Sequence, residues 1–385
     1  MSLVLSQLLP KCRATVVSLH NSSMFDIHQH HNSNDLQLHS RRTFHNGLTR
    51  NQRAITDPEN KGHHSRGVNF DTIGSWNNRL DMKILYDQSV KQGIPIPRIP
   101  IEEIGTASVI GRRKVNEDRS VMKELGPTLL YFAMFDGHGG AFAADFVSEY
   151  LHEYIANWLW KTTNLTDVLK FSFQDINNVM TRHLAHYHLN SDMFNTGTTA
   201  TVCLLRDSTD LVVGHVGDSR AILCRSGHPI RLSFDDHPDN QEESARIKEN
   251  GGKLVTNSLG EPKVNGRLAM TRSIGDCEMK QFGVTAKPHI KSIQVKHGKD
   301  AFLVLTTDGL NFVLSDQEVV DIIGSCENPT EAANLLTDQA LHFGSEDNTT
   351  AMIIPFGAWG KYRNTTNTIQ YSFGRNLSGN RFTHG

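Results

Sequence analysis

The chain has 385 residues, which is enough for one large domain or two ordinary ones with a substantial apolar core. Its formal net charge of -2 provides no positive field that would attract phosphates over distance, which argues against a protein that binds nucleic acids or anionic membranes. No apolar run approaches the length of a transmembrane helix, so we expect a soluble protein without a membrane span.

The first 25 residues have the composition of a mitochondrial presequence. They contain Lys11, Arg13 and several serines, and the first acidic residue is Asp26. Because transit segments are basic, serine-bearing and poor in acids, we predict that residues 1–25 direct the chain to the mitochondrial matrix. An ordinary disordered terminus is the alternative, and it would leave the protein in the cytosol.

Residues 26–100 are rich in His, Asn, Arg and Ser and poor in aliphatic side chains, so we predict a disordered or extended segment. The cluster His28-Gln29-His30-His31 could bind a transition metal, but no carboxylate or cysteine has a fixed spacing to it. The prolines that end this segment favour an extended strap leading into the domain, since a proline disfavours helix in the residue before it.

Residues 101–356 show the patterns of a globular domain. Runs rich in β-branched or aromatic residues predict strands at 129–135, 200–205, 211–216, 220–225, 302–306 and 351–356. Helical spacing and capping signals predict helices at 141–160, 165–187, 315–323 and 331–343. Strands in hairpin-like succession and helices in pairs indicate an α+β fold of antiparallel sheets covered by helices. Residues 357–385 lack periodicity and are predicted to be a loosely ordered tail.

Acidic residues stand at the ends of several apolar, strand-like runs. Asp136-Gly137 and Asp308-Gly309 each close such a run, and Asp347 precedes the last one. A single Asp-Gly pair is usually turn chemistry. Several carboxylates held on a rigid scaffold that opens to solvent are, however, what a pair of hard cations requires. We therefore predict a metal site at these strand ends.

A run of charged residues, 111–119, precedes the first of these strands. Such a run is usually a solvated surface. Beside a metal pair it would have a use, because Glu117 or Asp118 could ligate directly or through water. An arginine of the run could hold a phosphate with two hydrogen bonds.

Seven short motifs follow one another between residues 101 and 356. They are Arg113-x-x-x-Glu117-Asp118, Phe135-Asp136-Gly137-His138-Gly139-Gly140, Thr196-Gly197-Thr198-Thr199-Ala200, Val216-Gly217-Asp218-Ser219-Arg220, the stretch 264–276, Thr307-Asp308-Gly309 and Glu346-Asp347-Asn348. Each motif is weak alone. In this order they resemble the metal-dependent serine/threonine protein phosphatases of type 2C.

The resemblance implies a sandwich of two antiparallel β-sheets flanked by pairs of α-helices, with two Mn²⁺ or Mg²⁺ ions in a cleft at one end. Asp136 would bridge both ions. Asp308 and Asp347 would complete the first metal site, and Glu117 with the Gly137 carbonyl would complete the second.

The resemblance also assigns roles outside this core set. Asp118 would act through water, and Asp218 is the candidate ligand of a weaker third ion. Many members of the family carry Trp-Asp where this chain has Asn311-Phe312, and a phenyl ring cannot ligate, so a third site of the family's kind lacks one acid here. Residues 236–283 correspond to a mobile flap that borders the cleft and influences the choice of substrate.

The expected reaction is the hydrolysis of phosphoserine and phosphothreonine by a hydroxide that bridges the two cations. Arg113 would hold the phosphate dianion as charge spreads over its oxygens. His138 would donate a proton to the leaving serine or threonine oxygen. A histidine that merely orients a metal ligand is the alternative role for His138.

Within the family, the chain is most similar to the mitochondrial branch that acts on the branched-chain α-ketoacid dehydrogenase complex, which is therefore the expected phosphoprotein partner. The supporting residues include Trp76-Asn77-Asn78-Arg79, Asn311-Phe312 and the stretch 356–362. Two other classes stay open: a catalytically weak pseudophosphatase that binds phosphoproteins, and another two-metal hydrolase such as a nuclease. The intact core acids disfavour the first, and the near-neutral charge disfavours the second.

Overall fold

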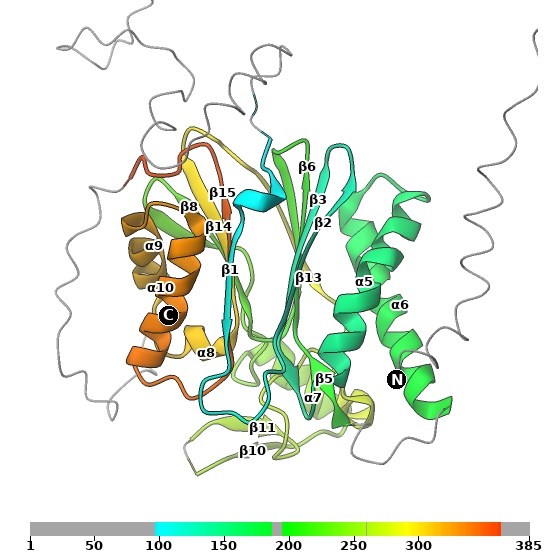
Figure 1. Cartoon of the computed structure of the whole chain (residues 1–385). Coiled ribbons are helices and arrows are strands. Elements are labelled where there is room, and N and C mark those ends of the chain that lie inside the picture. The colour runs from blue at the N-terminus through cyan, green and yellow to red at the C-terminus, as the bar shows by residue number, and fades with distance from the viewer. Residues whose placement is uncertain (1–95, 97, 187–194, 259, 363–385) are drawn as a thin grey trace, which may run out of the picture. The chain divides into compact units, whose positions relative to one another are not determined.

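Figure 1 shows the computed structural model, which describes residues 96, 98–186, 195–258 and 260–362. The predicted presequence, the histidine cluster at 28–31 and most of the predicted tail lie outside the described residues. In the described part of the chain, no helix is both long enough and apolar enough to cross a membrane.

Two five-stranded antiparallel sheets form the centre of the described structure. The first sheet has the strand order β1-β15-β14-β8-β9, and the second has the order β13-β7-β6-β3-β2. Figure 1 shows helices α9 and α10 beside the first sheet and helices α5 and α6 beside the second. This arrangement confirms the predicted α+β sandwich of antiparallel sheets flanked by pairs of helices. The strand bounds are β1 (Gly105–Val109), β2 (Arg119–Gly126), β3 (Leu129–Phe135), β6 (Ala200–Arg206), β7 (Asp210–Val216), β8 (Arg220–Arg225), β9 (His228–Arg231), β13 (His289–Gln294), β14 (Asp300–Thr306) and β15 (Thr349–Pro355).

The six predicted strands are the interior strands of the two sheets. Strands β14 and β15 are buried along their whole length, because a helix layer covers one face and the opposite sheet covers the other. The edge strands β1, β2, β9 and β13 were not predicted. Each edge strand is largely exposed or half-exposed and carries polar residues, so its sequence lacks the continuous apolar run of an interior strand.

The main helices agree with the predicted ranges to within a few residues at each end. They are α5 (Phe142–Leu159), α6 (Leu165–His186), α9 (Asp316–Ser325) and α10 (Pro329–His342). The predicted capping box opens α9: the Glu318 amide donates to the Ser315 hydroxyl, and the Ser315 amide donates to the Glu318 carboxylate at 2.8 Å. Helix α10 begins earlier than predicted, at Pro329, because Asn328 caps it by accepting a hydrogen bond from the Glu331 amide.

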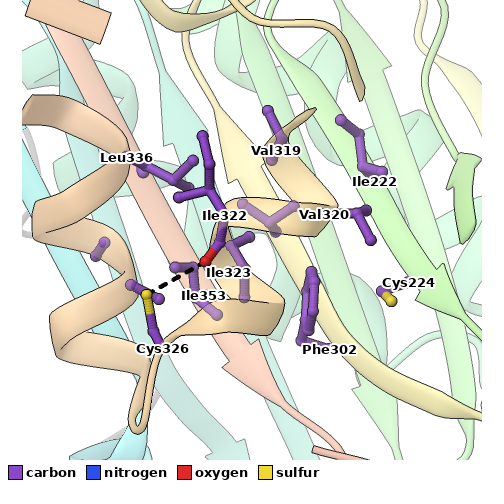
Figure 2. Close-up of a cluster of buried hydrophobic side chains, with 14 of the residues drawn as sticks. Ile222, Cys224, Phe302, Val319, Val320, Ile322, Ile323, Cys326, Leu336 and Ile353 are labelled. Carbon is purple, nitrogen blue, oxygen red and sulfur yellow. Dashed lines mark hydrogen bonds between the residues drawn. The ribbon is translucent and has the colours of Figure 1, made fainter. Parts of the chain in front are cut away.

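Apolar side chains form one core between the two sheets and a second core under α9 and α10. Figure 2 shows the second core, in which Phe302 and Ile353 of the sheet pack with Ile322 and Leu336 of the helices. Trp359 also belongs to this core and is 4% exposed. The packed chain therefore continues past residue 356, where the sequence predicted that the domain ends.

The stretch 236–283, predicted to be the flap, has secondary structure and an apolar cluster of its own. It contains α7 (Gln241–Glu249), the hairpin β10 (Leu254–Thr256) and β11 (Pro262–Val264), and the 3-10 helix η3 (Cys277–Phe282). Ile247, Val264 and Met279 are among the buried residues of its cluster.

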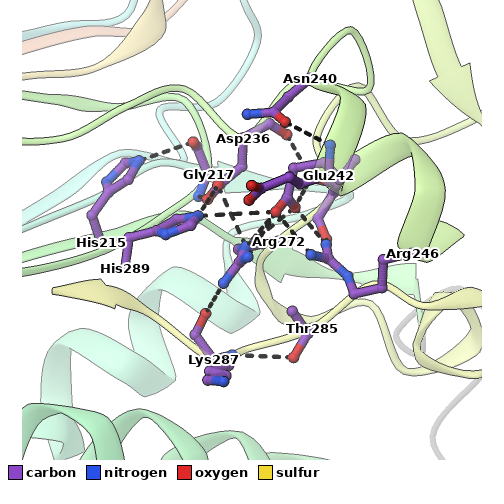
Figure 3. A network of polar contacts seen from close by, with 12 residues as sticks. His215, Gly217, Asp236, Asn240, Glu242, Arg246, Arg272, Thr285, Lys287 and His289 are labelled. Carbon is purple, nitrogen blue, oxygen red and sulfur yellow. Dashed lines mark hydrogen bonds and ion pairs between the residues drawn. The ribbon is translucent and has the colours of Figure 1, made fainter.

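A network of ion pairs ties this flap to the sandwich, and we call it the flap anchor (Figure 3). It consists of Asp236, Glu243, Arg246, Arg272 and His289. Both arginines donate to the buried Glu243 carboxylate at 2.7–3.1 Å, except for one 2.5 Å contact from Arg246. Asp236 accepts a 2.8 Å hydrogen bond from the Gly217 amide in the sandwich, and its other oxygen lies 3.1 Å from Nε2 of His289 on strand β13.

Candidate active site

The predicted acids come together at one end of the sandwich. Asp136 follows β3, Asp308 opens the short helix α8 (Asp308–Asn311) directly after β14, and Asp118 precedes β2. The Asp308 amide donates to the Asp136 carboxylate at 3.5 Å, so acids from the two sheets meet across the sandwich. Thr307 and Thr350 hold one oxygen of Asp118, with hydroxyl contacts of 3.0 and 2.6 Å. The strand ends therefore supply the convergence that the sequence predicted.

These carboxylates are buried close enough to perturb one another. Burial raises the pKa of Asp136 well above its usual range, and the neighbouring charge of Asp308 raises it further. The pKa of Asp308 is raised in the same way, by burial first and then by Asp218 and Asp347. The pKa of Asp118 rises to about 6, mainly through burial. A group of acids that resist ionising together has the electrostatics of a cation site that the protein's own side chains do not neutralise.

Two oxygens of this group fit a metal site particularly well. One carboxylate oxygen of Asp118 and one of Asp218 are buried and have no hydrogen-bond partner among the described residues. A buried carboxylate oxygen without a donor is costly, and a divalent cation or its coordinated water would compensate that cost. The residues present therefore fit a site for hard cations.

Glu117 and Gly137 are also in contact. A β-carbon on Gly137 would lie 2.8 Å from the Glu117 carbonyl oxygen, so only glycine lets the two backbones approach this closely. The Glu117 carboxylate accepts a 3.3 Å hydrogen bond from the Gly140 amide, and its backbone amide donates to Asn348 at 2.8 Å. The two residues that the resemblance assigns to one ion thus have adjacent backbones.

Arg113 lies at the exposed rim of the acid group. Its guanidinium donates to the Asp347 carboxylate at 2.5 Å, and its side chain is 61% exposed. The hydrogen bond that Arg113 donates to Asp347 raises the pKa of Arg113, so the guanidinium stays charged. Arg113, Gly309, Phe312 and Asp347 line one groove that opens beside the acids. A phosphate in this groove could reach the Arg113 guanidinium beside Asp347.

His138 lies in the two-residue strand β4 (Gly137–His138), next to the acids. Its Nε2 atom is 2.9 Å from both carboxylate oxygens of Asp276. Burial alone lowers the pKa of His138, but the charge and hydrogen bond of Asp276 outweigh burial and raise it. Asp276 was not among the predicted site residues, although it ends the motif at 264–276. Sequence spacing gives no sign that it meets His138.

Only one of the acids expected for a third ion, Asp218, is present. Asp218 lies in the turn between β7 and β8, and its backbone carbonyl accepts from the Asn311 side chain at 3.2 Å. Phe312, where many relatives have an acid, is 52% exposed.

The flap anchor contains another possible cation site within the described residues: donor atoms of Asp236, Glu243 and His289 lie within 4.8 Å of one another. Arg246 and Arg272 already donate to the Glu243 carboxylate, and their hydrogen bonds hold its pKa far below the usual range despite burial. Two guanidinium groups satisfy these acids, so this cluster is a structural ion-pair network.

The family model for protein phosphatase 2C matches residues 114–349. The chain belongs to the protein phosphatase 2C family. It is therefore a protein serine/threonine phosphatase. The chain is 48% identical over 313 residues to "Protein phosphatase 1K, mitochondrial" of Xenopus laevis, and the alignment covers 81% of this chain and 83% of that protein. It is also 35% identical over 242 residues to "Protein phosphatase 2C homolog 1" of Saccharomyces cerevisiae, covering 58% of this chain and 81% of the yeast protein.

Solved structures agree with the fold. A sex-determining protein of C. elegans superposes with a TM-score of 0.61 at 22% identity, covering 74% of this chain and 72% of that one. A serine-threonine phosphatase 2C from Toxoplasma gondii superposes with a TM-score of 0.58 at 23% identity, covering 66% and 94%. These similarities support the protein phosphatase 2C sandwich.

Proposed function

We propose that this protein phosphatase 2C hydrolyses phosphoserine and phosphothreonine with two Mn²⁺ or Mg²⁺ ions bound at the end of the sandwich. The observation that carries the proposal is the group of buried acids whose pKa values are raised by burial and by each other's charge. Metal dependence is general in this family, and the partnerless oxygens of Asp118 and Asp218 support it here.

In this proposal, Asp136, Asp308 and Asp347, together with Glu117 and the Gly137 carbonyl, would hold the two ions. Asp118 would act through water. When bound, the ions would neutralise the acids and activate water as the nucleophile at neutral pH.

Two side chains bind the phosphate and supply the proton for the leaving group. Arg113 receives the phosphate dianion at the groove, where its exposed guanidinium can form two hydrogen bonds and neutralise charge on the phosphoryl oxygens. His138 gives a proton to the departing serine or threonine oxygen, which would otherwise leave as a poorly stabilised alkoxide.

Turnover of a phosphoserine peptide and of a nitrophenyl phosphodiester, each with Mn²⁺, Mg²⁺ or EDTA, tests this proposal. We expect peptide turnover that needs the metal, little diester turnover, and loss of activity in Asp308→Asn with the fold retained. Full activity in EDTA would contradict the metal site. A preference for the diester would instead favour a nuclease-like hydrolase, and phosphopeptide binding without turnover would favour a pseudophosphatase.

We further propose mitochondria as the location and the phosphorylated branched-chain α-ketoacid dehydrogenase complex as the substrate. The similarity to the mitochondrial Xenopus protein over 81% of the chain supports this proposal, as does the basic, serine-bearing sequence of residues 1–25. Imaging of the tagged full chain tests the location, with a cytosolic signal as the contrary result. Dephosphorylation of this complex no faster than that of unrelated phosphoproteins would remove the substrate assignment and leave the chemistry in place.

A further inference from the structure

The contact between His138 and Asp276 joins two parts of the chain that are far apart in sequence. Nε2 of His138 is 2.9 Å from each Asp276 oxygen, and the Asp276 side chain is 4% exposed. Asp276 lies at the end of the flap and is none of the acids assigned to the metal site. Its contact with the site is made through the imidazole.

A small sheet brings the pair together. It has the order β12-β5-β4, in which β5 (Gly197–Thr198) pairs with both β12 (Ile274–Gly275) and β4. A β-carbon on Gly197 would lie 2.2 Å from an Asp276 oxygen and 2.4 Å from Nε2 of His138. The pair therefore lies directly over the Gly197 α-carbon, and a larger residue there would push it apart.

Contacts other than the one with His138 also hold Asp276 in place. The Ser273 hydroxyl donates to one of its oxygens at 2.5 Å, and the Asp276 amide donates to the Thr196 carbonyl at 2.9 Å. Lys280 is half-buried near this carboxylate and donates to the Ser273 carbonyl at 2.7 Å. Burial raises the pKa of Asp276, but His138, Lys280 and Ser273 together outweigh burial and lower it. The carboxylate is thus an oriented anion.

Because the Asp276 carboxylate engages Nε2 of His138, only Nδ1 is left to interact with a substrate. Nε2–H donates to Asp276, while Nδ1 of His138 is buried and has no hydrogen-bond partner among the described residues. A buried imidazole nitrogen without a partner has an unmet hydrogen-bonding need, and a substrate oxygen that enters beside the candidate ligands would meet it.

We propose that Asp276 is a positioning residue that holds His138 with its Nδ1–H directed at the leaving oxygen of the phosphorylated side chain. This inference rests on the proposed function. As hydroxide forms the new P–O bond, the old P–O bond breaks and its electron pair stays on the serine or threonine oxygen. That oxygen takes the Nδ1 proton, so the products are the free hydroxyl side chain and phosphate, and His138 later regains a proton from water.

The test compares two substrates in the Asp276→Asn variant of the full chain with Mn²⁺. Removing a residue that orients a reacting group typically costs about 10- to 100-fold, and we expect this loss in kcat for a phosphoserine peptide. Nitrophenyl phosphate has a leaving group that needs no proton, so its turnover should change less than about threefold. A residue with a purely structural role would not separate the two substrates.

Glu243→Gln is the matched control, because it also removes a buried acid of the flap but touches neither His138 nor the candidate ligands. It should affect both substrates equally. If Asp276→Asn does not fold, Ser273→Ala keeps the carboxylate and removes its hydroxyl donor, and it should show the same substrate selectivity with a smaller loss.

A double variant decides whether Asp276 acts through His138. His138→Ala with Asp276→Asn should be no slower on the peptide than His138→Ala alone. The positioning role would be overturned if the loss in the double variant equalled the product of the two single losses. Equal losses on both substrates in Asp276→Asn would also overturn it. Wild-type protein without metal-dependent turnover of nitrophenyl phosphate would instead overturn the proposed function itself.

Discussion

Replacing Asp118 with asparagine should stabilise the metal-free protein at neutral pH, although it damages the site. The folded protein raises the pKa of this buried acid from 3.8 to about 6. At about 1.4 kcal/mol per pH unit, ionised Asp118 costs the metal-free fold roughly 3 kcal/mol at pH 7. A neutral isostere of the same shape does not carry this cost.

The sign follows from proton binding. Because the folded pKa lies above the unfolded value, the folded state binds the proton more tightly, and stability is lost as the pH rises from 3.8 through about 6. The advantage of Asp118→Asn should therefore be complete above about pH 7 and fall below about 1 kcal/mol near pH 4. Mn²⁺ or Mg²⁺ should narrow the advantage, since a ligand at 100 times its Kd stabilises the wild-type fold by about 2.7 kcal/mol.

Thermal melts in EDTA across this pH range measure the effect. For a domain of this size, 3 kcal/mol corresponds to a Tm about 6–12 °C higher in the variant at neutral pH. Glu243→Gln is the control with the opposite sign, because the arginines lower the pKa of Glu243 and its loss should destabilise the neutral-pH protein. An Asp118→Asn protein that melts below the wild type in EDTA at neutral pH would refute the reasoning.

Three further substitutions test separate parts of the structure. Arg113→Ala should raise KM for a phosphopeptide by about tenfold with metal affinity unchanged in calorimetry. Arg112→Ala, which removes an exposed pair with Glu346 from the lining of the same groove, should raise KM less, and equal effects would argue against a phosphate role specific to Arg113. Gly137→Ala should weaken metal binding at least tenfold in the same titration, because its β-carbon would lie 2.8 Å from the Glu117 backbone carbonyl oxygen. Unchanged affinity would show that metal binding does not require the close approach of the Gly137 and Glu117 backbones. Trp359→Ala should lower the free energy of unfolding by about 3–5 kcal/mol in urea titrations, and a loss below about 1 kcal/mol would contradict its place in the core.

The interior of the fold could be predicted from the sequence because burial on both faces leaves a strong signal. Strand β3 is an unbroken apolar run and was predicted at its observed bounds, Leu129–Phe135. Its neighbour β2 carries Arg119, Lys123 and Glu124 on a half-exposed edge, and nothing in that pattern distinguishes it from a solvated loop. Segments such as β2 become strands only because an interior strand is present to pair with them, and a local pattern does not contain that partner.

The residues of the candidate site also differ in whether a local sequence pattern could predict them. Asp136 and Asp308 could be predicted because each follows a recognisable interior strand, and a strand end fixes the position of the next side chain. Asp276 could not, since it reaches His138 through a three-stranded sheet whose strands are two residues long. Pairings this short leave no periodicity to read, so the contact exists only at the level of tertiary structure.

Two groups of buried acids in the described part of the chain differ in the cationic side chains around them, and this difference supports the choice of the candidate metal site. In the flap anchor, Arg246 and Arg272 satisfy Glu243, lower its pKa and leave nothing for a metal to add. At the end of the sandwich, Asp136 and Asp308 mainly face other carboxylates, and their pKa values rise. A fold selected for stability alone would have placed arginines there too, or apolar residues. The uncompensated group is therefore where we propose that the protein gives up stability in order to bind cations from solution.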